Sequence, residues 1–295
     1  MAWLTSRTLF LLLTLLLGLT GLAQIAVQVR RPAVDEAYGK VIFETKSDFS
    51  RIRLREKDRV RRLFFVDDSG AEHCQSAIDL ATPATLQHGY AKRMFASLLF
   101  REPQERILLV GLGGGGMVRF LGERFPATFV EAVEIDPVVV SIASEYFGVR
   151  DGPRAKIHTA DAFTFFDSPR DPYDAIYLDA FLRAPEISGP GTATERLKTE
   201  AFLQTLRSHL KPGGLIAFNL IRTDPHTDRD LASIRAVFPE PIRFDVPGTG
   251  NLVVIALREG KSPTREELIR RGETLDAENP DLGFSLAEIA GNRIE

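Results

Sequence analysis

The chain is poor in the residues that build disulfides and metal sites. Its 295 residues include one cysteine, Cys74, so no intrachain disulfide can form. This count neither supports nor excludes export, because many exported proteins also lack disulfides. The five histidines and the single cysteine show no metal-ligand spacing, so the sequence predicts no metal site.

A strong positive charge is also absent. The chain has 37 basic and 40 acidic residues, which gives a formal net charge of −3. Domains that bind nucleic acid usually carry a basic excess, so we expect no nucleic-acid partner. The mild acidity suits a cationic substrate, although solubility alone would also account for it. The length allows one substantial core with or without a small appended domain.

Residues 1–31 contain a leucine-rich apolar run that begins at Thr8 and continues to Val29. Three interpretations stay open: a signal peptide cleaved near residue 23, an uncleaved membrane anchor, or a start codon assigned too early. The arginines that follow the run favour a cytoplasmic location for the rest of the chain. We therefore expect a membrane-anchored protein with a cytoplasmic catalytic domain, and export after cleavage is the alternative.

Short apolar pieces alternate with charged residues between residues 40 and 77. This period of two, interrupted by the turn Asp67-Asp68-Ser69-Gly70, is typical of antiparallel strands. We predict a small N-terminal β-domain over residues 32–80, followed by a helix over residues 81–99.

Predicted strands and helices alternate from residue 107 onward, which indicates a mostly parallel sheet with helices on both faces. We place this α/β domain at residues 81–258, and we predict a polar C-terminal tail at 259–295 with one surface helix at 265–271. The predicted strands are 107–110, 128–133, 155–160, 173–181, 215–220 and 251–257, and the predicted helices are 117–124, 138–147, 199–210 and 231–237.

A run of four glycines, Gly113–Gly116, follows the first of these strands and Gly111. Glycines at such a junction allow positive φ angles and a close approach of a ligand to a helix N-terminus. The spacing of Gly111, Gly113 and Gly116 also fits a dinucleotide-binding turn, so the loop alone does not identify its ligand.

Three acidic residues, Glu134, Asp161 and Asp179, stand at the ends of the next predicted strands. Because the carboxyl ends of parallel strands meet at one edge of a sheet, we expect these acids near the glycine loop. Glu134 could accept from both hydroxyls of a ribose, Asp161 could accept from an adenine amino group beside Ala162, and Asp179 would face the reacting atom. Each acid could instead be a plain helix N-cap. A dinucleotide site would explain Glu134 but would leave Asp161 and Asp179 without a role.

Together these motifs resemble the spermidine synthase (polyamine aminopropyltransferase) superfamily, a branch of the class I S-adenosylmethionine-dependent methyltransferase fold. The resemblance covers about residues 38–257 and implies a Rossmann-like α/β fold, S-adenosylmethionine or its decarboxylated form as cofactor, and subunit pairing through the β-domain. It implies cofactor contacts for Gly111, Gly113, Gly114, Gly115, Glu134, Asp161 and Ala162, substrate contacts for Tyr90 and Asp179, and a catalytic role for Asp179.

The departures from the family pattern bear on the substrate. The family's glycine loop carries an aspartate that pairs with the aminopropyl amine, and this chain has Gly114 there. The family's strand-four motif has two aspartates, and here Leu182 follows Asp179 at the second position. A glutamine before an early strand is replaced by Ser50. Because a buried diamine needs paired acids, these changes argue against tight polyamine binding.

An aspartate at position 114 would also repel the carboxylate of intact S-adenosylmethionine. We therefore expect a transferase that moves a methyl group to a small acceptor, with Asp179 as general base or as the group that orients an amine. The alternatives are an aminopropyltransferase with an altered acceptor site and a nucleoside-binding protein without turnover.

Overall fold

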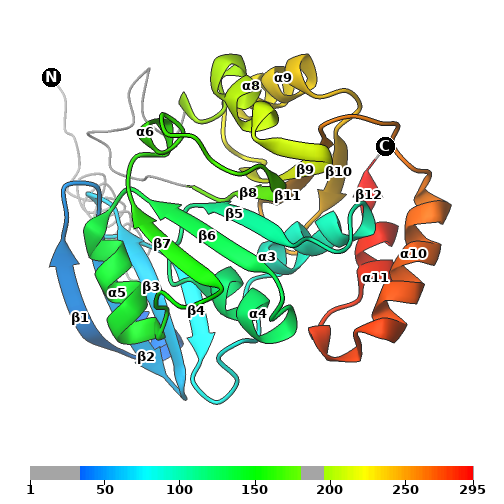
Figure 1. The fold of residues 1–295 in the computed structure, drawn as a ribbon. Coiled ribbons are helices and arrows are strands. Elements are labelled where there is room, and N and C mark those ends of the chain that lie inside the picture. Colours follow the sequence, from blue (N-terminus) through cyan, green and yellow to red (C-terminus); the bar gives the residue numbers. More distant parts are fainter. Residues whose placement is uncertain (1–33, 181–195, 295) are drawn as a thin grey trace, which may run out of the picture.

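The computed structural model describes residues 34–180 and 196–294, which form two β-sheets with helices around the larger one (Figure 1). The expected leader and Leu182 lie outside the described residues. Within the described ranges, no helix has the length and apolar character needed to cross a membrane.

The smaller sheet is fully antiparallel, as the alternating pattern predicts. Its order is β1 (Lys40–Lys46), β2 (Arg51–Lys57), β3 (Val60–Val66) and β4 (Glu72–Asp79), and the short helix α2 (Val34–Tyr38) precedes it. One face packs on helix α5 (Pro137–Phe147), because alternate apolar side chains of the strands meet the apolar face of that helix. The residues buried in this contact are Ile52, Leu54, Leu63, Phe65, Ile78, Val139, Ile142 and Phe147.

The larger sheet has eight strands, of which five neighbouring strands are parallel. From one edge to the other the order is β12-β10-β11-β9-β8-β5-β6-β7. The parallel strands are β5 (Arg106–Val110), β6 (Phe129–Glu134), β7 (Ala155–Thr159), β8 (Tyr173–Leu178) and β9 (Leu210–Ile221), and β10 (Ile242–Asp245), β11 (Asn251–Leu257) and β12 (Arg293–Ile294) pair antiparallel. The mostly parallel α/β sheet is therefore confirmed.

Helices cover both faces of this sheet, as expected (Figure 1). Along β5, Ile107 and Leu109 enter one apolar cluster, and Leu108 and Val110 enter the other. The first cluster includes residues of α3 (Gly89–Met94), the 3₁₀ helix η1 (Phe95–Leu99) and α4 (Gly116–Arg124), and the second includes residues of α6 (Ala162–Phe165), α8 (Glu200–Ser208) and α9 (Thr227–Val237).

The order of strands changes direction at β5. The chain adds β6 and β7 on one side of β5 and then returns to place β8 on the other side. In open α/β sheets a ligand crevice forms beyond the carboxyl ends of the strands at such a switch point. The fold therefore places the glycine loop, which follows β5, at the mouth of this crevice.

Several predicted elements have different bounds, and helix α9 begins at Thr227 rather than 231. The helix predicted over residues 81–99 begins only at Gly89, because turns that include Pro83 occupy the segment before it. Strand β9 begins at Leu210 rather than 215, so the segment 211–214 is part of the strand, and the pairing of β8 with β9 shifts its register there.

The C-terminal region contains more structure than the predicted polar tail with one surface helix at 265–271. Helix α10 (Arg265–Glu278), the 3₁₀ helix η3 (Pro280–Leu282) and α11 (Leu286–Gly291) lead into the edge strand β12. Leu268 and Leu275 of α10 are buried together with Leu286 and Ile289 of α11. At Gly272 a Cβ would lie 2.5 Å from the backbone nitrogen of Ala287, so glycine permits this close packing.

Candidate functional site

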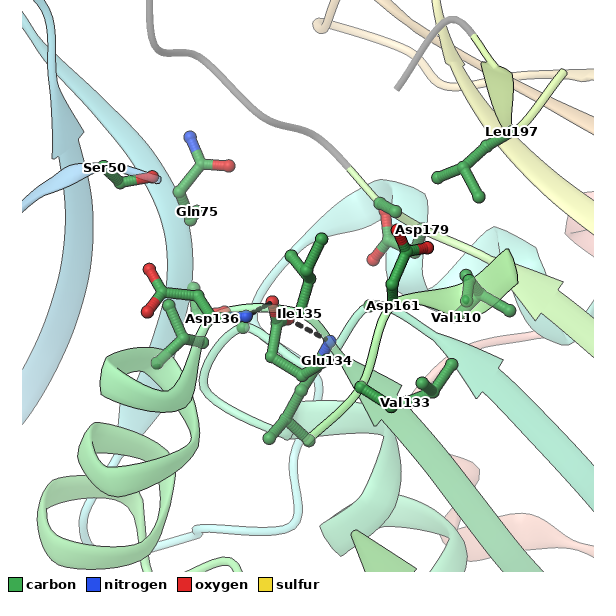
Figure 2. A pocket seen from close by; sticks show the side chains of 18 of the residues that line it. Ser50, Gln75, Val110, Val133, Glu134, Ile135, Asp136, Asp161, Asp179 and Leu197 are labelled. Carbon is green, nitrogen blue, oxygen red and sulfur yellow. Dashed lines mark hydrogen bonds between the residues drawn. The ribbon is translucent and has the colours of Figure 1, made fainter. Parts of the chain in front are cut away.

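A cavity lies beyond the carboxyl ends of β5, β6, β7 and β8, with the small sheet on its other side (Figure 2). Ser50 and Gln75 line it from the small sheet, and Asp161 and Asp179 line it from the ends of β7 and β8. The parallel sheet therefore brings the predicted loop and the three predicted acids together. Other residues that line the cavity are Phe65, Ser76, Tyr90, Gly111, Leu112, Gly113, Glu134, Asp136, Ala162, Phe163, Ala180 and Leu197.

Glu134 holds the glycine loop in place. Its two carboxylate oxygens each accept a backbone hydrogen bond of 3.0 Å, one from the N–H of Leu112 and one from the N–H of Asp136 (Figure 2). Burial raises the pKa of Glu134, and the backbone donors act in the opposite direction. A carboxylate oxygen has two lone pairs, so Glu134 keeps capacity for a ligand hydroxyl while it shapes the loop.

The glycine loop approaches the end of β8 closely. Gly111 has a φ of 99°, and a Cβ there would lie 2.3 Å from the carbonyl oxygen of Asp179. Gly113 has a φ of 53° and also lines the cavity. Positive φ favours glycine at both positions, and the added Cβ would also lie only 2.7 Å from Ser76 Oγ at Gly113.

Gly114 and Gly115 are not among the residues that line the cavity. The N–H of Gly114 donates a 2.8 Å hydrogen bond to the hydroxyl of Ser76, and a Cβ at Gly114 would lie 2.9 Å from both Ser76 Cβ and Phe147 Cδ1. A Cβ at Gly115 would lie 2.4 Å from a methyl carbon of Val149. An added Cβ at either glycine would therefore face packed side chains, and the expected cofactor contacts of Gly114 and Gly115 stay predictions.

Asp161 is an N-cap as well as a cavity residue. Its Oδ1 accepts the backbone N–H of Phe163 at 2.9 Å at the start of α6. Ala162 and Phe163 follow it along the cavity wall. The cap orients the carboxyl group at the end of β7, where its second oxygen remains available to a ligand.

Asp179 is at the centre of a polar network. Its Oδ1 accepts a 2.9 Å hydrogen bond from Asn219, whose own oxygen accepts one of 2.9 Å from Asn251. The Tyr90 hydroxyl also interacts with the carboxylate of Asp179. Burial raises the pKa of Asp179 to about 6, and the interactions with Asn219 and Tyr90 limit the rise. Asp179 is therefore ionised at neutral pH.

Sequence analysis missed Asn219 and Asn251. Each is a polar residue in or beside an apolar strand, which is the one signal that the sequence offered. Asn219 is buried, and it meets Asn251 only because β9 and β11 pair antiparallel with Val253 opposite Asn219. That register could not be read from the sequence.

Ser50 offers a hydroxyl without a partner. Its side chain is 5% exposed, and its Oγ has no hydrogen-bond partner among the described residues. Gln75 lies near it in Figure 2 and donates one hydrogen bond, of 3.0 Å, to the carbonyl of His73. A buried polar atom without a partner in a cavity marks a place where a ligand group can bind. In the described ranges, no cluster of His, Cys, Asp and Glu could hold a metal ion.

Comparison with known proteins gives two kinds of relative. The family model of the spermine/spermidine synthase domain matches residues 87–232. The polyamine aminopropyltransferase of Vibrio vulnificus is 30% identical over 239 residues, which cover 80% of this chain and 77% of that protein. The human eEF1A lysine and N-terminal methyltransferase is 35% identical over 202 residues, which cover 63% of this chain and 28% of that protein.

Two solved structures share the fold. Human methyltransferase-like protein 13 in complex with SAH has a TM-score of 0.58 at 29% identity and covers 65% of this chain and 93% of that one. A spermidine synthase in complex with the transition state analogue AdoDATO has a TM-score of 0.65 at 20% identity and covers 86% of this chain and 84% of that one.

Proposed function

This chain belongs to the spermidine synthase-like superfamily and is a transferase, and we propose that it moves the methyl group of S-adenosylmethionine to an amine of a small acceptor. The support comes from the cavity at the switch point, the carboxylates around it and the environment of Gly114. Relatives with solved structures bind SAH and AdoDATO, both adenosyl compounds of this type.

The cavity residues suit each part of the adenosyl ligand. Glu134 would accept from the ribose hydroxyls, and Asp161 would accept from the adenine amino group with Phe163 beside the ring. The hydroxyl of Ser50 and the second amide hydrogen of Gln75 are neutral donors that would bind the ligand's carboxylate.

One observation carries the choice of methyl transfer. The space beside Gly114 is filled by Ser76 and Phe147, so a side-chain carboxylate that could pair with an aminopropyl ammonium has no room there. A cation that is buried without such a pair loses several kcal/mol, on the order expected for uncompensated desolvation. In intact S-adenosylmethionine the ligand's own carboxylate accompanies this ammonium, so the loop favours the intact amino-acid end over the decarboxylated form.

Asp179 and Tyr90 are the residues that would bind the acceptor amine. The carboxylate of Asp179 is ionised at neutral pH, so it can orient an amine and take the proton that the nitrogen loses. Tyr90 remains protonated, because burial and the nearby charge of Asp179 raise its pKa well above the usual value. Bound S-adenosylmethionine supplies an electrophilic methyl carbon, and the protein contributes alignment.

Aminopropyl transfer is the second candidate, and one feature of the cavity favours it. The described residues that line the cavity include Glu134, Asp136, Asp161 and Asp179 but no lysine or arginine. Such a wall also suits the decarboxylated ligand, which carries one more net positive charge. The family's two polyamine-binding aspartates are replaced here by Gly114 and Leu182, and their loss argues against aminopropyl transfer.

Product analysis separates the two candidates. The purified chain is incubated with S-adenosylmethionine and primary amines, or with the decarboxylated form and 1,4-diaminobutane, and the products are identified by mass spectrometry. We expect a methylated amine and S-adenosylhomocysteine from the first mixture. Spermidine from the second mixture without S-adenosylhomocysteine from the first would reject the proposal.

Membrane anchoring with a cytoplasmic catalytic domain and subunit pairing through the small sheet stay proposals. The first rests on the apolar run in residues 1–31 and would be tested with a topology reporter fused to the C-terminus. The second would be tested by analytical ultracentrifugation of the purified chain.

A further inference from the structure

A second cavity adjoins the proposed adenosyl site at Tyr90 and Asp179. Both residues line both cavities, as do Ser76 and Leu112. The second cavity is bounded by the segment that precedes α3 and by the start of α4. A ligand in this second cavity would therefore lie against the carboxylate of Asp179.

The wall of this second cavity combines an apolar part with polar groups. Leu86, Ala91 and Met117 are buried apolar residues in it, and Gly116 leaves its side open. Asp179 is the one acidic residue among the described residues that line it. The apolar part of the wall suits an alkyl stem. A single amine at the end of that stem can pair with the single carboxylate, that of Asp179.

His88 adds a polar group to the same cavity that the mechanism above leaves unused. Its Nε2 is buried without a hydrogen-bond partner in the described part of the chain. The imidazole stacks on the ring of Tyr90, with centroids 5.6 Å apart and planes at 23°. Burial lowers the pKa of His88, so the ring is neutral at physiological pH and Nε2 can form a hydrogen bond with a bound amine or amide.

We propose that this cavity is the acceptor site and that it takes a monoamine on an alkyl stem, held by Asp179 and Tyr90 at one point and by His88 Nε2 at another. The inference rests on the proposed function, because it names the substrate class of the same transfer. A diamine is disfavoured, since its second ammonium would find no second carboxylate among the described residues of this wall.

The test measures amine binding, which needs no turnover. n-Butylamine and 1,4-diaminobutane are titrated calorimetrically into the full chain, with and without S-adenosylhomocysteine. Gly116→Val narrows the cavity at low structural cost, because a Cβ there would meet only Arg119 Nη2, at 3.9 Å. His88→Ala removes the imidazole, His88→Gln restores a hydrogen-bonding group, and His209→Ala is the matched control outside both cavities.

We expect n-butylamine to bind at least as tightly as the diamine. Gly116→Val should weaken the binding of n-butylamine about tenfold or more. His88→Ala should weaken it about fivefold, and this smaller change corresponds to the loss of one hydrogen bond. His88→Gln should recover part of the loss, and His209→Ala should match the wild type. Unchanged butylamine binding in both Gly116→Val and His88→Ala, no amine binding at all, or tighter binding of the diamine would overturn the inference.

The same titrations keep the two proposals apart. If S-adenosylhomocysteine fails to bind while butylamine binding depends on Gly116 and His88 as expected, the proposed cofactor is wrong and the amine site stands. If the nucleoside binds and the amine does not, the acceptor site is wrong and the proposed function stands.

Discussion

Gly114 and Ser76 are joined by a 2.8 Å hydrogen bond from the backbone N–H of the glycine to the serine hydroxyl. This bond connects the glycine loop of the large sheet to strand β4 of the small sheet. Together with Phe147 on α5, it leaves no volume for a side chain at position 114. The contact explains how the loop differs from a polyamine-binding loop, in terms of packing as well as charge.

Gly114→Asp should therefore fail to create a polyamine enzyme. We expect it to lower the free energy of unfolding by about 1–3 kcal/mol through overpacking against Ser76 and Phe147. Chemical denaturation measures the loss, and Gly122→Asp is the control because nothing lies within 4 Å of a Cβ there. Full stability of Gly114→Asp together with tighter binding of decarboxylated S-adenosylmethionine would contradict this packing argument.

Removal of the Glu134 carboxylate should abolish most nucleoside binding. Glu134→Ala loses the ribose acceptor and also the two hydrogen bonds that shape the loop, so we expect affinity for 5′-methylthioadenosine to fall by roughly ten- to a hundredfold or more. Calorimetry gives the affinity, and Glu145→Gln on the exposed face of α5 is the control. An unchanged affinity would show that Glu134 does not bind the ribose.

The pH dependence of the reaction should follow Asp179. Because its pKa is about 6 and the reaction needs the ionised form, kcat/KM should rise with pH through about 6 and then level off. Asn219→Ala removes a hydrogen bond that favours the charged form, so the midpoint should move to higher pH. An unchanged midpoint of the pH profile in Asn219→Ala would show that Asn219 does not set the pKa of Asp179.

Asp179 should also make folding stability depend on pH. Its folded-state pKa of about 6 lies above its ordinary value of 3.8, so its favourable contribution is complete below pH 3.8 and is lost as pH rises to about 6. Asp179→Asn should therefore be stabilising at pH 8 by up to about 2–3 kcal/mol, and much less so at pH 4. Urea unfolding at the two pH values measures the difference, and an equal effect at both would contradict it.

The chain pattern predicted the architecture because strands and helices leave different periodicities, and because strand ends in a parallel sheet must meet. Glu134, Asp161 and Asp179 were found in this way. Asn219 and Asn251 were not, since their contact depends on the register of two antiparallel strands. The burial of His88 Nε2 was missed for a similar reason, because it follows from the path of a turn-rich segment.

The C-terminal region shows the limit of composition as a guide. Residues 259–295 are polar on average, yet a few apolar residues on one face of α10 and α11 are enough to pack both helices against the core. The surroundings of a glycine are also hard to predict from sequence. Gly113 lines the cavity and can contact a ligand, whereas Gly114 faces packed side chains. Only the folded structure distinguishes the two.

The central claim is that this site is built for intact S-adenosylmethionine. Calorimetric titration of the purified chain with S-adenosylmethionine and with its decarboxylated form tests it most directly, with 5′-methylthioadenosine as the reference for the shared nucleoside. The account predicts that S-adenosylmethionine binds more tightly than the decarboxylated form. Tighter binding of the decarboxylated form would contradict the account.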